Sequence, residues 1–292
     1  MHTLTRQQLV VLVLLTLVWG INWPIMKLGV TDFPPLSFRT ISMWLGLPVL
    51  AAVLLVRGVS FRIPRPYWRE LLVLTVLNML VWHTLAILAI RSLSSGRAAI
   101  LGYTMPVFSA MIGALWFSQR LAPRAWAGVA AAALGVVLLL WHEATALTGR
   151  PLGVAMMLLA AAIWAVGTHR MRRTTIPAST LAISFWMTLI TTLWMTLLSV
   201  MFERSDWHWP SPPVWSAIVY NGLAVFAFAQ VAWLSLARDL PPIASTLSVM
   251  FIPVLGVFSG AWWLGEVLHW QDWAAVALVI AAIALVLWPK QV

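Results

Sequence analysis

Two side chains that can hydrogen-bond stand in one of the most apolar stretches of this chain. In ELLVLTVLNMLVWHTLAILAI, Asn78 and His83 are surrounded by leucine, valine, isoleucine and alanine. An amide or imidazole buried in a membrane span is costly and is a functional candidate by default. Such a pair can hold the polar group of a bound solute. Bonding to a neighbouring helix is the alternative role for either side chain.

A second copy of this arrangement lies 147 residues further on, where Gln230 takes the place of His83. Helical spacing puts Met79 on the same face as His83, at i and i+4, and puts Asn78 and Trp82 together on the adjacent face. We therefore expect these five residues to line a cavity between helices.

Aromatic residues can supply the apolar part of the same cavity. Tyr103 is one of only three tyrosines, and Trp164 lies at the centre of an apolar run, with Trp19 as its counterpart in the first run. Most of the other tryptophans suit interfacial belts or lipid contact. Ser245 and Ser248 are weaker polar candidates. A cavity built in this way suits a ligand with one flat apolar end and one hydrogen-bonding end.

The elements that position these residues must be membrane helices. The chain has 292 residues, of which 62% are hydrophobic and only 9% charged, whereas soluble proteins carry about 25% charged residues. Crossing the hydrocarbon core of a bilayer takes about 20 apolar residues. The sequence predicts an all-α membrane protein with ten transmembrane helices, at about 8–29, 35–56, 69–91, 97–118, 124–141, 151–169, 178–201, 214–236, 243–265 and 271–288.

The charge pattern predicts the orientation. A net charge of +10 in a soluble protein would suggest nucleic acid, but these cations lie between apolar runs and fit an anionic lipid surface. With the N-terminus inside, twelve Lys and Arg residues lie on the inner side and six on the outer side. The positive-inside rule then predicts both termini in the cytoplasm and a location in the cytoplasmic (inner) membrane. The absence of cysteine excludes disulfides and thiolate metal sites.

The chain repeats itself. MPVFSAMIGALWFSQRL and IPVLGVFSGAWWLGEVL lie 147 residues apart, and the aligned segments 105–126 and 252–273 share seven identities in 22 positions. We expect one membrane unit of two five-helix repeats, 1–145 and 146–292. Because five is odd, the second copy must cross in the opposite direction, an inverted repeat that recurs in secondary transporters. A duplication retained only for stability, in a receptor or scaffold, is the alternative. Two internal repeats can do the work of a dimer, so we expect a monomer.

Each copy of this motif begins with a proline inside an apolar helix. Pro106 and Pro253 each remove a backbone donor and predict a kink. Gly113 and Gly260 follow seven residues later, each paired with a small residue four positions earlier, a spacing that lets another helix approach closely. We interpret these four residues as hinges of a gate, with ordinary kinks in a static bundle as the alternative.

Charged residues at the outer helix ends are expected to stay at the membrane interface or in water. Arg39 and Arg97 could meet a solute carboxylate, but snorkelling to the interface is the expected behaviour of both. Glu266 is expected to stay solvated. No carboxylate lies near the middle of a span, which favours passive flux, while His83 leaves proton coupling open. Neither an HExxH motif nor a nucleotide-binding loop is present. We therefore expect a protein that is not an enzyme and uses no cofactor or metal.

These features resemble a known family. Two five-helix repeats, Trp19-Gly20, Trp164-Ala165 and the run from Pro253 to Gly265-Glu266 are similar to the EamA branch of the drug/metabolite transporter (DMT) superfamily, and most similar to YddG-type exporters of aromatic amino acids. The first repeat departs from the pattern, with Ser118-Gln119 in place of Gly-Glu.

The resemblance implies a central cavity lined mainly by the first, third, fourth, sixth, eighth and ninth helices, and export of small amphipathic solutes by alternating access. Aromatic or hydrophobic amino acids are the expected solutes. A multidrug or nucleoside-type exporter remains an alternative, as does a membrane-embedded enzyme or scaffold.

The orientation can be tested by labelling, because the native chain has no cysteine. We expect Ser211→Cys to react with an impermeant thiol reagent in intact cells, and Pro64→Cys to react only after lysis. The opposite pattern would overturn the orientation and the direction of export that follows from it.

Overall fold

The structure, a computed structural model, describes residues 5–117, 123–145, 151–230, 232 and 242–287. Every regular element among these residues is helical, which confirms the all-α fold class. The elements are α1 (Arg6–Thr31), α2 (Pro35–Val56), η1 (Arg65–Tyr67), α3 (Trp68–Thr75), η2 (Val76–Leu80), α4 (Val81–Ser92), α5 (Ser95–Gly102), α6 (Met105–Phe117), α7 (Pro123–Thr145), α8 (Pro151–Met171), α9 (Thr180–Glu203), η3 (Arg204–Asp206), α10 (Pro212–Val219), η4 (Tyr220–Ala229), α12 (Pro242–Leu264) and α13 (Trp270–Leu287).

Within the described residues, seven helical stretches are long and apolar enough to cross a membrane. They are Arg6–Thr31, Pro35–Val56, Arg65–Ser92, Ser95–Trp116, Pro151–Met171, Thr180–Asp206 and Pro212–Ala229. Three shorter apolar helices, Pro123–Leu139, Met250–Leu264 and Trp270–Leu285, lie where the sequence predicts the fifth, ninth and tenth spans. The total of ten spans stays a prediction.

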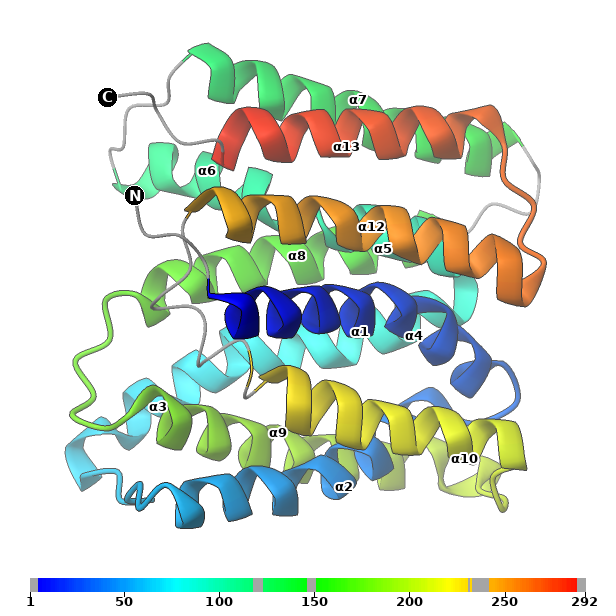
Figure 1. The fold of residues 1–292 in the computed structure, drawn as a ribbon. Helices are drawn as coiled ribbons and strands as arrows, with labels where there is room; N and C mark the ends of the chain where they lie inside the picture. The colour runs from blue at the N-terminus through cyan, green and yellow to red at the C-terminus, as the bar shows by residue number, and fades with distance from the viewer. Residues whose placement is uncertain (1–4, 118–122, 146–150, 231, 233–241, 288–292) are drawn as a thin grey trace.

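The helices form one bundle in which α1 begins and α13 ends at the same end (Figure 1). We call this end, marked by Arg6 and Leu287, the proximal end, and the end marked by Thr31 and Trp270 the distal end. The helix α7 packs along α13 at one edge of the bundle, and α2 packs along α9 at the other. Between them α1 packs against α12, and α4 against α8, so that helices from the two halves of the chain alternate through the core.

Proline starts several of the helices. Five of them, α2, α7, α8, α10 and α12, have proline as their first residue. The fixed φ of proline suits the first helical position, where its missing N–H would have had no partner within the helix. Three further prolines, Pro24, Pro48 and Pro253, lie inside helices that continue past them.

The predicted span at 97–118 is not one helix. It breaks between α5 and α6, where the Thr104 backbone N–H donates to the Leu101 carbonyl at 3.2 Å and the Thr104 hydroxyl donates to the same oxygen at 2.6 Å. Pro106 is therefore the second residue of a new helix, a position in which proline is tolerated. Pro253 lies inside the continuous α12. The two prolines occupy different local structures, although the sequence around them repeats.

Two carboxylates cap helix starts at the distal end. Pro34 precedes α2 and has no side chain to cap it, and Glu203 from the end of α9 accepts instead from the backbone N–H groups of Leu36 and Ser37 at 2.9 and 2.7 Å. Glu266, which follows α12, accepts from the Ser95 N–H at 2.6 Å and its hydroxyl at 2.9 Å. The expectation that Glu266 stays solvated is wrong, because the start of α5 needs acceptors for its free N–H groups.

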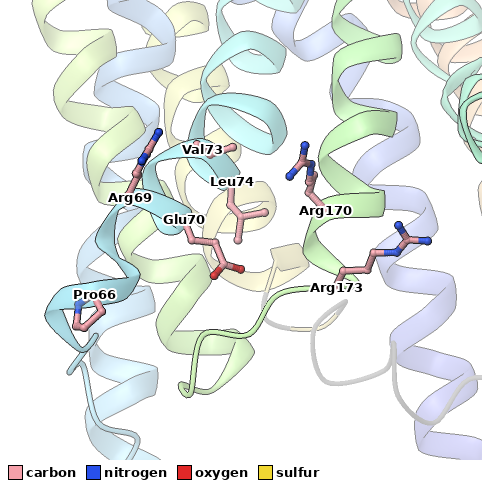
Figure 2. Close-up of a pocket in the computed structure, with 7 residues that line it drawn as sticks. All are labelled: Pro66, Arg69, Glu70, Val73, Leu74, Arg170 and Arg173. Atoms are coloured by element: carbon pink, nitrogen blue, oxygen red, sulfur yellow. The ribbon is translucent and has the colours of Figure 1, made fainter. Parts of the chain in front are cut away.

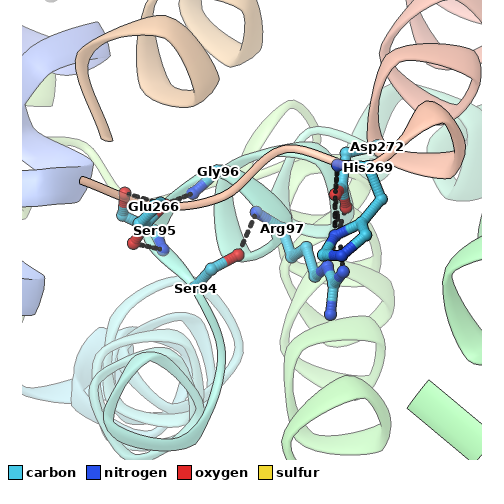
Figure 3. Close-up of polar contacts among 7 residues, drawn as sticks. All are labelled: Ser94, Ser95, Gly96, Arg97, Glu266, His269 and Asp272. Carbon is cyan, nitrogen blue, oxygen red and sulfur yellow. Dashed lines mark hydrogen bonds and ion pairs between the residues drawn. The ribbon is translucent and has the colours of Figure 1, made fainter. Parts of the chain in front are cut away.

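The same distal end holds further links between distant parts of the chain (Figure 3). Arg97 of α5 donates to Asp272 of α13, with 2.7 Å between Nε and Oδ1. Arg97 is thus ion-paired with a residue of α13. Lys27 of α1 donates to three carbonyls at the end of α4, including that of Leu93 at 2.8 Å. Charged groups therefore hold the distal helix ends together.

Removing the cap on α5 should destabilise the protein. Glu266→Ala leaves several donors without their acceptor, so we expect a loss of about 1–3 kcal/mol, and Glu266→Gln should lose less. The measurement is thermal unfolding in detergent. Asp32→Asn is the matched control, because Asp32 is an exposed acid at the same end. Equal melting temperatures for Glu266→Ala and Asp32→Asn would show that the cap contributes nothing.

Candidate functional site

A buried arginine lies at the meeting point of three helices. Arg39 of α2 is only 3% exposed. It donates through Nη1 to Asn221 Oδ1 at 3.3 Å and through Nη2 to Met26 Sδ at 2.8 Å. Its guanidinium also lies 5.5 Å from the centre of the Phe226 ring, within the range of a cation–π contact. The expected snorkelling is therefore wrong for Arg39, whose side chain is buried in the protein.

His83 lies beside this arginine on the same aromatic ring. Its imidazole centroid is 5.2 Å from that of Phe226. His83 Nδ1 is buried and has no hydrogen-bond partner among the described residues, and the same holds for Arg39 Nε and Asn22 Oδ1. Buried polar atoms are almost always paired in proteins. We call Asn22, Arg39, His83 and Asn221, together with Phe226, the polar cluster.

Next to the polar cluster lies a group of aromatic rings. Trp23 and Tyr103 meet edge to face with centroids 6.3 Å apart, and Trp82 and Trp164 lie 6.5 Å apart. The two pairs converge on Gly102, where an added Cβ would lie 2.9 Å from Trp23 and 3.3 Å from Trp82. The lack of a side chain at Gly102 lets these rings approach. We call these four aromatic residues the aromatic cluster.

Two π-helical segments shape this region. Shifting η2 (76–80) by the repeat offset of 147 gives 223–227, which falls inside η4. Such segments are rare in helices and occur often at functional sites. Two residues predicted to share a face, in and just after η2, have different neighbours. Met79 packs with Ile183 and Met187 of α9, whereas His83 packs on Phe226.

The other residues predicted to line the site differ in burial and in their contacts. Asn78 is buried and donates to the Leu74 carbonyl of its own helix at 2.9 Å, in close contact with Gly167. Trp19 is half-buried and packs with Leu15. Gln230 is half-buried just after η4. Ser245 and Ser248 lie in α12, outside the residues whose side chains the structure describes.

The predicted hinge glycines lie where helices pack closely or are buried. A side chain at Gly260 would collide with the Ser95 hydroxyl and lie 2.6 Å from Glu266 Oε2, so α12 packs closely on the start of α5. Gly113 is buried in α6.

One turn before Gly113, Ser109 bonds to His169, a residue that the sequence analysis missed. His169 Nε2 lies 2.8 Å from the Ser109 carbonyl oxygen.

The sequence analysis also missed Trp23, Asn221 and Phe226. Trp23 could have been found, because it follows Trp19 by four residues and so shares its helix face. Asn221 could also have been found, because it is an amide inside the predicted span 214–236. Phe226 is an ordinary apolar residue and carries no such signal.

A cleft of about 630 Å³ opens at the proximal end between α3 and the end of α8 (Figure 2). Glu70 in this cleft accepts from the hydroxyls of Thr174 and Thr175 at 2.7 and 3.1 Å. The lining residues are Pro66, Arg69, Glu70, Val73, Leu74, Arg170 and Arg173. None of the site residues predicted from the sequence is among them, and three of the seven are arginines, so the cleft is basic.

Comparison with known proteins identifies relatives over nearly the whole chain. YoaV of Bacillus subtilis, described as an uncharacterized transporter, is 24% identical over 85% of each chain. The uncharacterized inner membrane transporter YedA of Escherichia coli is 26% identical over 93% of this chain and 88% of that protein. A probable amino-acid metabolite efflux pump of Salmonella typhimurium is 27% identical over 92% of this chain and 91% of that protein.

A solved crystal structure shares the fold, with a TM-score of 0.66 at 22% identity over 94% of this chain and 96% of that one. The model of the EamA-like transporter family matches twice, over residues 7–141 and again over 151–288. The chain belongs to the EamA-like transporter family.

Proposed function

We propose that this protein exports small amphipathic solutes, most favourably aromatic or hydrophobic amino acids, by alternating access. The observation that carries the proposal is that members of the two clusters are neighbours along two helices. Asn22 and Trp23 are neighbours on α1, and Trp82 and His83 are neighbours on α4. Each pair gives one member to the polar cluster and one to the aromatic cluster. A solute with a flat apolar end and a polar end would match both.

The proposed path runs from the proximal to the distal end. The basic proximal cleft supports entry from that side, which is the cytoplasmic side by the positive-inside rule. The carboxylate caps and the Arg97–Asp272 pair hold the distal helix ends together. We infer that this arrangement is the inward-facing state, and that the distal contacts separate when the solute leaves.

The proposed mechanism uses two inverted five-helix repeats, 1–145 and 146–292, in one membrane unit with ten spans and both termini cytoplasmic. The double match of the family model and the coincidence of η2 with η4 under the repeat offset support this division. Pro106, Gly113, Pro253 and Gly260 act as the hinges. The helix breaks just before Pro106 and continues past Pro253, so the two prolines lie in different local structures.

Transport by purified protein in liposomes tests the proposal. We expect uptake or release of labelled L-phenylalanine and L-tryptophan without chemical change. His83→Ala, Tyr103→Ala and Trp164→Ala should each weaken apparent affinity about tenfold or more, because a lost buried hydrogen bond or ring contact costs about 1–3 kcal/mol. Trp126→Ala is the control, because Trp126 is a helical tryptophan that is 52% exposed.

Each result has a definite meaning. Unchanged flux in all three variants would place the solute site elsewhere. Movement of lipophilic drugs or nucleosides in place of amino acids would favour the multidrug or nucleoside alternative. Chemical conversion of the solute would indicate an enzyme.

The hinge role of the prolines can be tested by distance measurements between spin labels. Cysteines introduced at Arg69 and Arg170 report the proximal mouth, and those at Asp32 and Trp270 report the distal mouth. Pro253→Ala restores a backbone donor inside α12 and should slow turnover more than it weakens binding. Pro106→Ala should shift the distances in the other sense, by favouring a continuous α5–α6 helix. If neither substitution alters flux or either distance distribution, the prolines are passive.

A further inference from the structure

The buried arginine of the polar cluster has no carboxylate partner in the part of the chain that the structure describes. Arg39 is 3% exposed, and no ion pair joins it to an acid of the described residues. Its contacts are an amide oxygen, a thioether sulfur and an aromatic face. A buried charge is costly unless it is paired, and these neutral contacts compensate it only in part.

The guanidinium also lies deep in the bundle. It contacts Asn221, which is nine residues, about 14 Å of helix, from the start of α10 at the distal end. It shares the Phe226 ring with His83, which is nine residues from the end of α4 at the same end. Arg39 itself lies near the start of α2, but these contacts and its 3% exposure hold the guanidinium inside the protein. An anionic partner therefore has to come from within the protein or from a bound solute.

The unpartnered atoms around Arg39 have complementary chemistry. Arg39 Nε–H is a free donor for an anion, and Asn22 Oδ1 is a free acceptor for an ammonium group. Asn22 lies one turn before Met26 on the same face of α1, and Met26 accepts from Arg39 Nη2. Helical spacing thus puts Asn22 on the face of α1 that contacts Arg39 through Met26, and the next residue, Trp23, belongs to the aromatic cluster.

We propose that Arg39 binds the carboxylate of the transported solute and that Asn22 accepts a hydrogen bond from its ammonium group, so that the solute is a zwitterionic α-amino acid. This inference rests on the proposed function and adds the groups that distinguish an amino acid from an aromatic amine or a neutral drug. The aromatic side chain lies against Trp23, Tyr103, Trp82 and Trp164. The solute neutralises the guanidinium only while it is bound, which stabilises the loaded state over the empty one.

Binding of matched probes to purified protein in detergent tests the assignment. The probes are L-tryptophan, its amide, which lacks the carboxylate charge, and indole-3-propionate, which lacks the ammonium group. We expect wild-type protein to bind L-tryptophan about tenfold or more tightly than either analogue, because charge-assisted hydrogen bonds are the strong ones. Arg39→Gln should abolish the preference over the amide, and Asn22→Ala the preference over indole-3-propionate.

Two further variants separate a binding role from a structural one. Arg39→Lys keeps the charge but loses the planar fork, so it should fold and bind L-tryptophan with intermediate affinity. Arg39→Met removes an unpaired buried charge, so the melting temperature without solute should be equal to or higher than that of the wild type. Arg204→Gln, at an exposed arginine in η3, is the control for loss of one positive charge.

The outcomes separate the two proposals. If the amino acid and its amide bind equally well and Arg39→Gln changes neither, the carboxylate assignment is overturned while amino-acid transport stands. A lower melting temperature for Arg39→Met, with the preference over the amide retained in Arg39→Lys and Arg39→Gln, would make Arg39 a structural residue. If none of the three probes binds or is transported, both proposals fall.

Discussion

The fold of this protein follows from the requirement that backbone polar groups buried in lipid find partners inside the protein. Helices meet that requirement along their length, and the described residues form only helical elements. The requirement becomes demanding where a helix starts or breaks. Glu203 and Glu266 supply acceptors at the starts of α2 and α5, and Thr104 satisfies a carbonyl where α5 ends. Side chains distant in sequence thus complete the helix ends.

The same physics explains why so few polar side chains carry so much of the chemistry. In a region with little water, a polar side chain either bonds its own helix or remains available to a partner. Asn78 and Thr75 take the first course by donating to carbonyls one turn earlier. Asn22, Arg39 and His83 keep atoms without a partner in the described residues. The proposed solute site rests on atoms of the second kind.

The two halves of the chain share sequence but not every local structure. The π-helical segments coincide under the repeat offset, whereas the proline motif gives a broken helix in one half and a continuous one in the other. The neighbours differ as well: Gly260 packs on the start of α5 and Glu266, and Ser109 in the first copy bonds to His169. Such asymmetry is expected where two ends of a transporter must open at different times.

The amino-acid sequence by itself determined that the chain is helical, that lipid surrounds it, and that His83, Tyr103, Trp82 and Trp164 are candidates for one site. These conclusions rest on composition and helical periodicity, which are local properties of the chain. The structure places Trp82 against Trp164 and Tyr103 against Trp23. Met79 and His83, which helical spacing puts on one face, have different neighbours in the bundle, α9 for Met79 and Phe226 for His83.

Only the tertiary structure decided the surroundings of the charged residues. Arg39 and Glu266 lie near helix ends, and from sequence alone the membrane interface or water was the expected environment. The partners of Arg39 come from positions 13 and 182 residues away, and those of Glu266 from positions 170 and 171 residues away. A charge near a helix end can turn outward to solvent or inward to another helix. The direction that the side chain takes depends on which donors and acceptors the packed bundle brings within reach. Local sequence patterns do not contain that information.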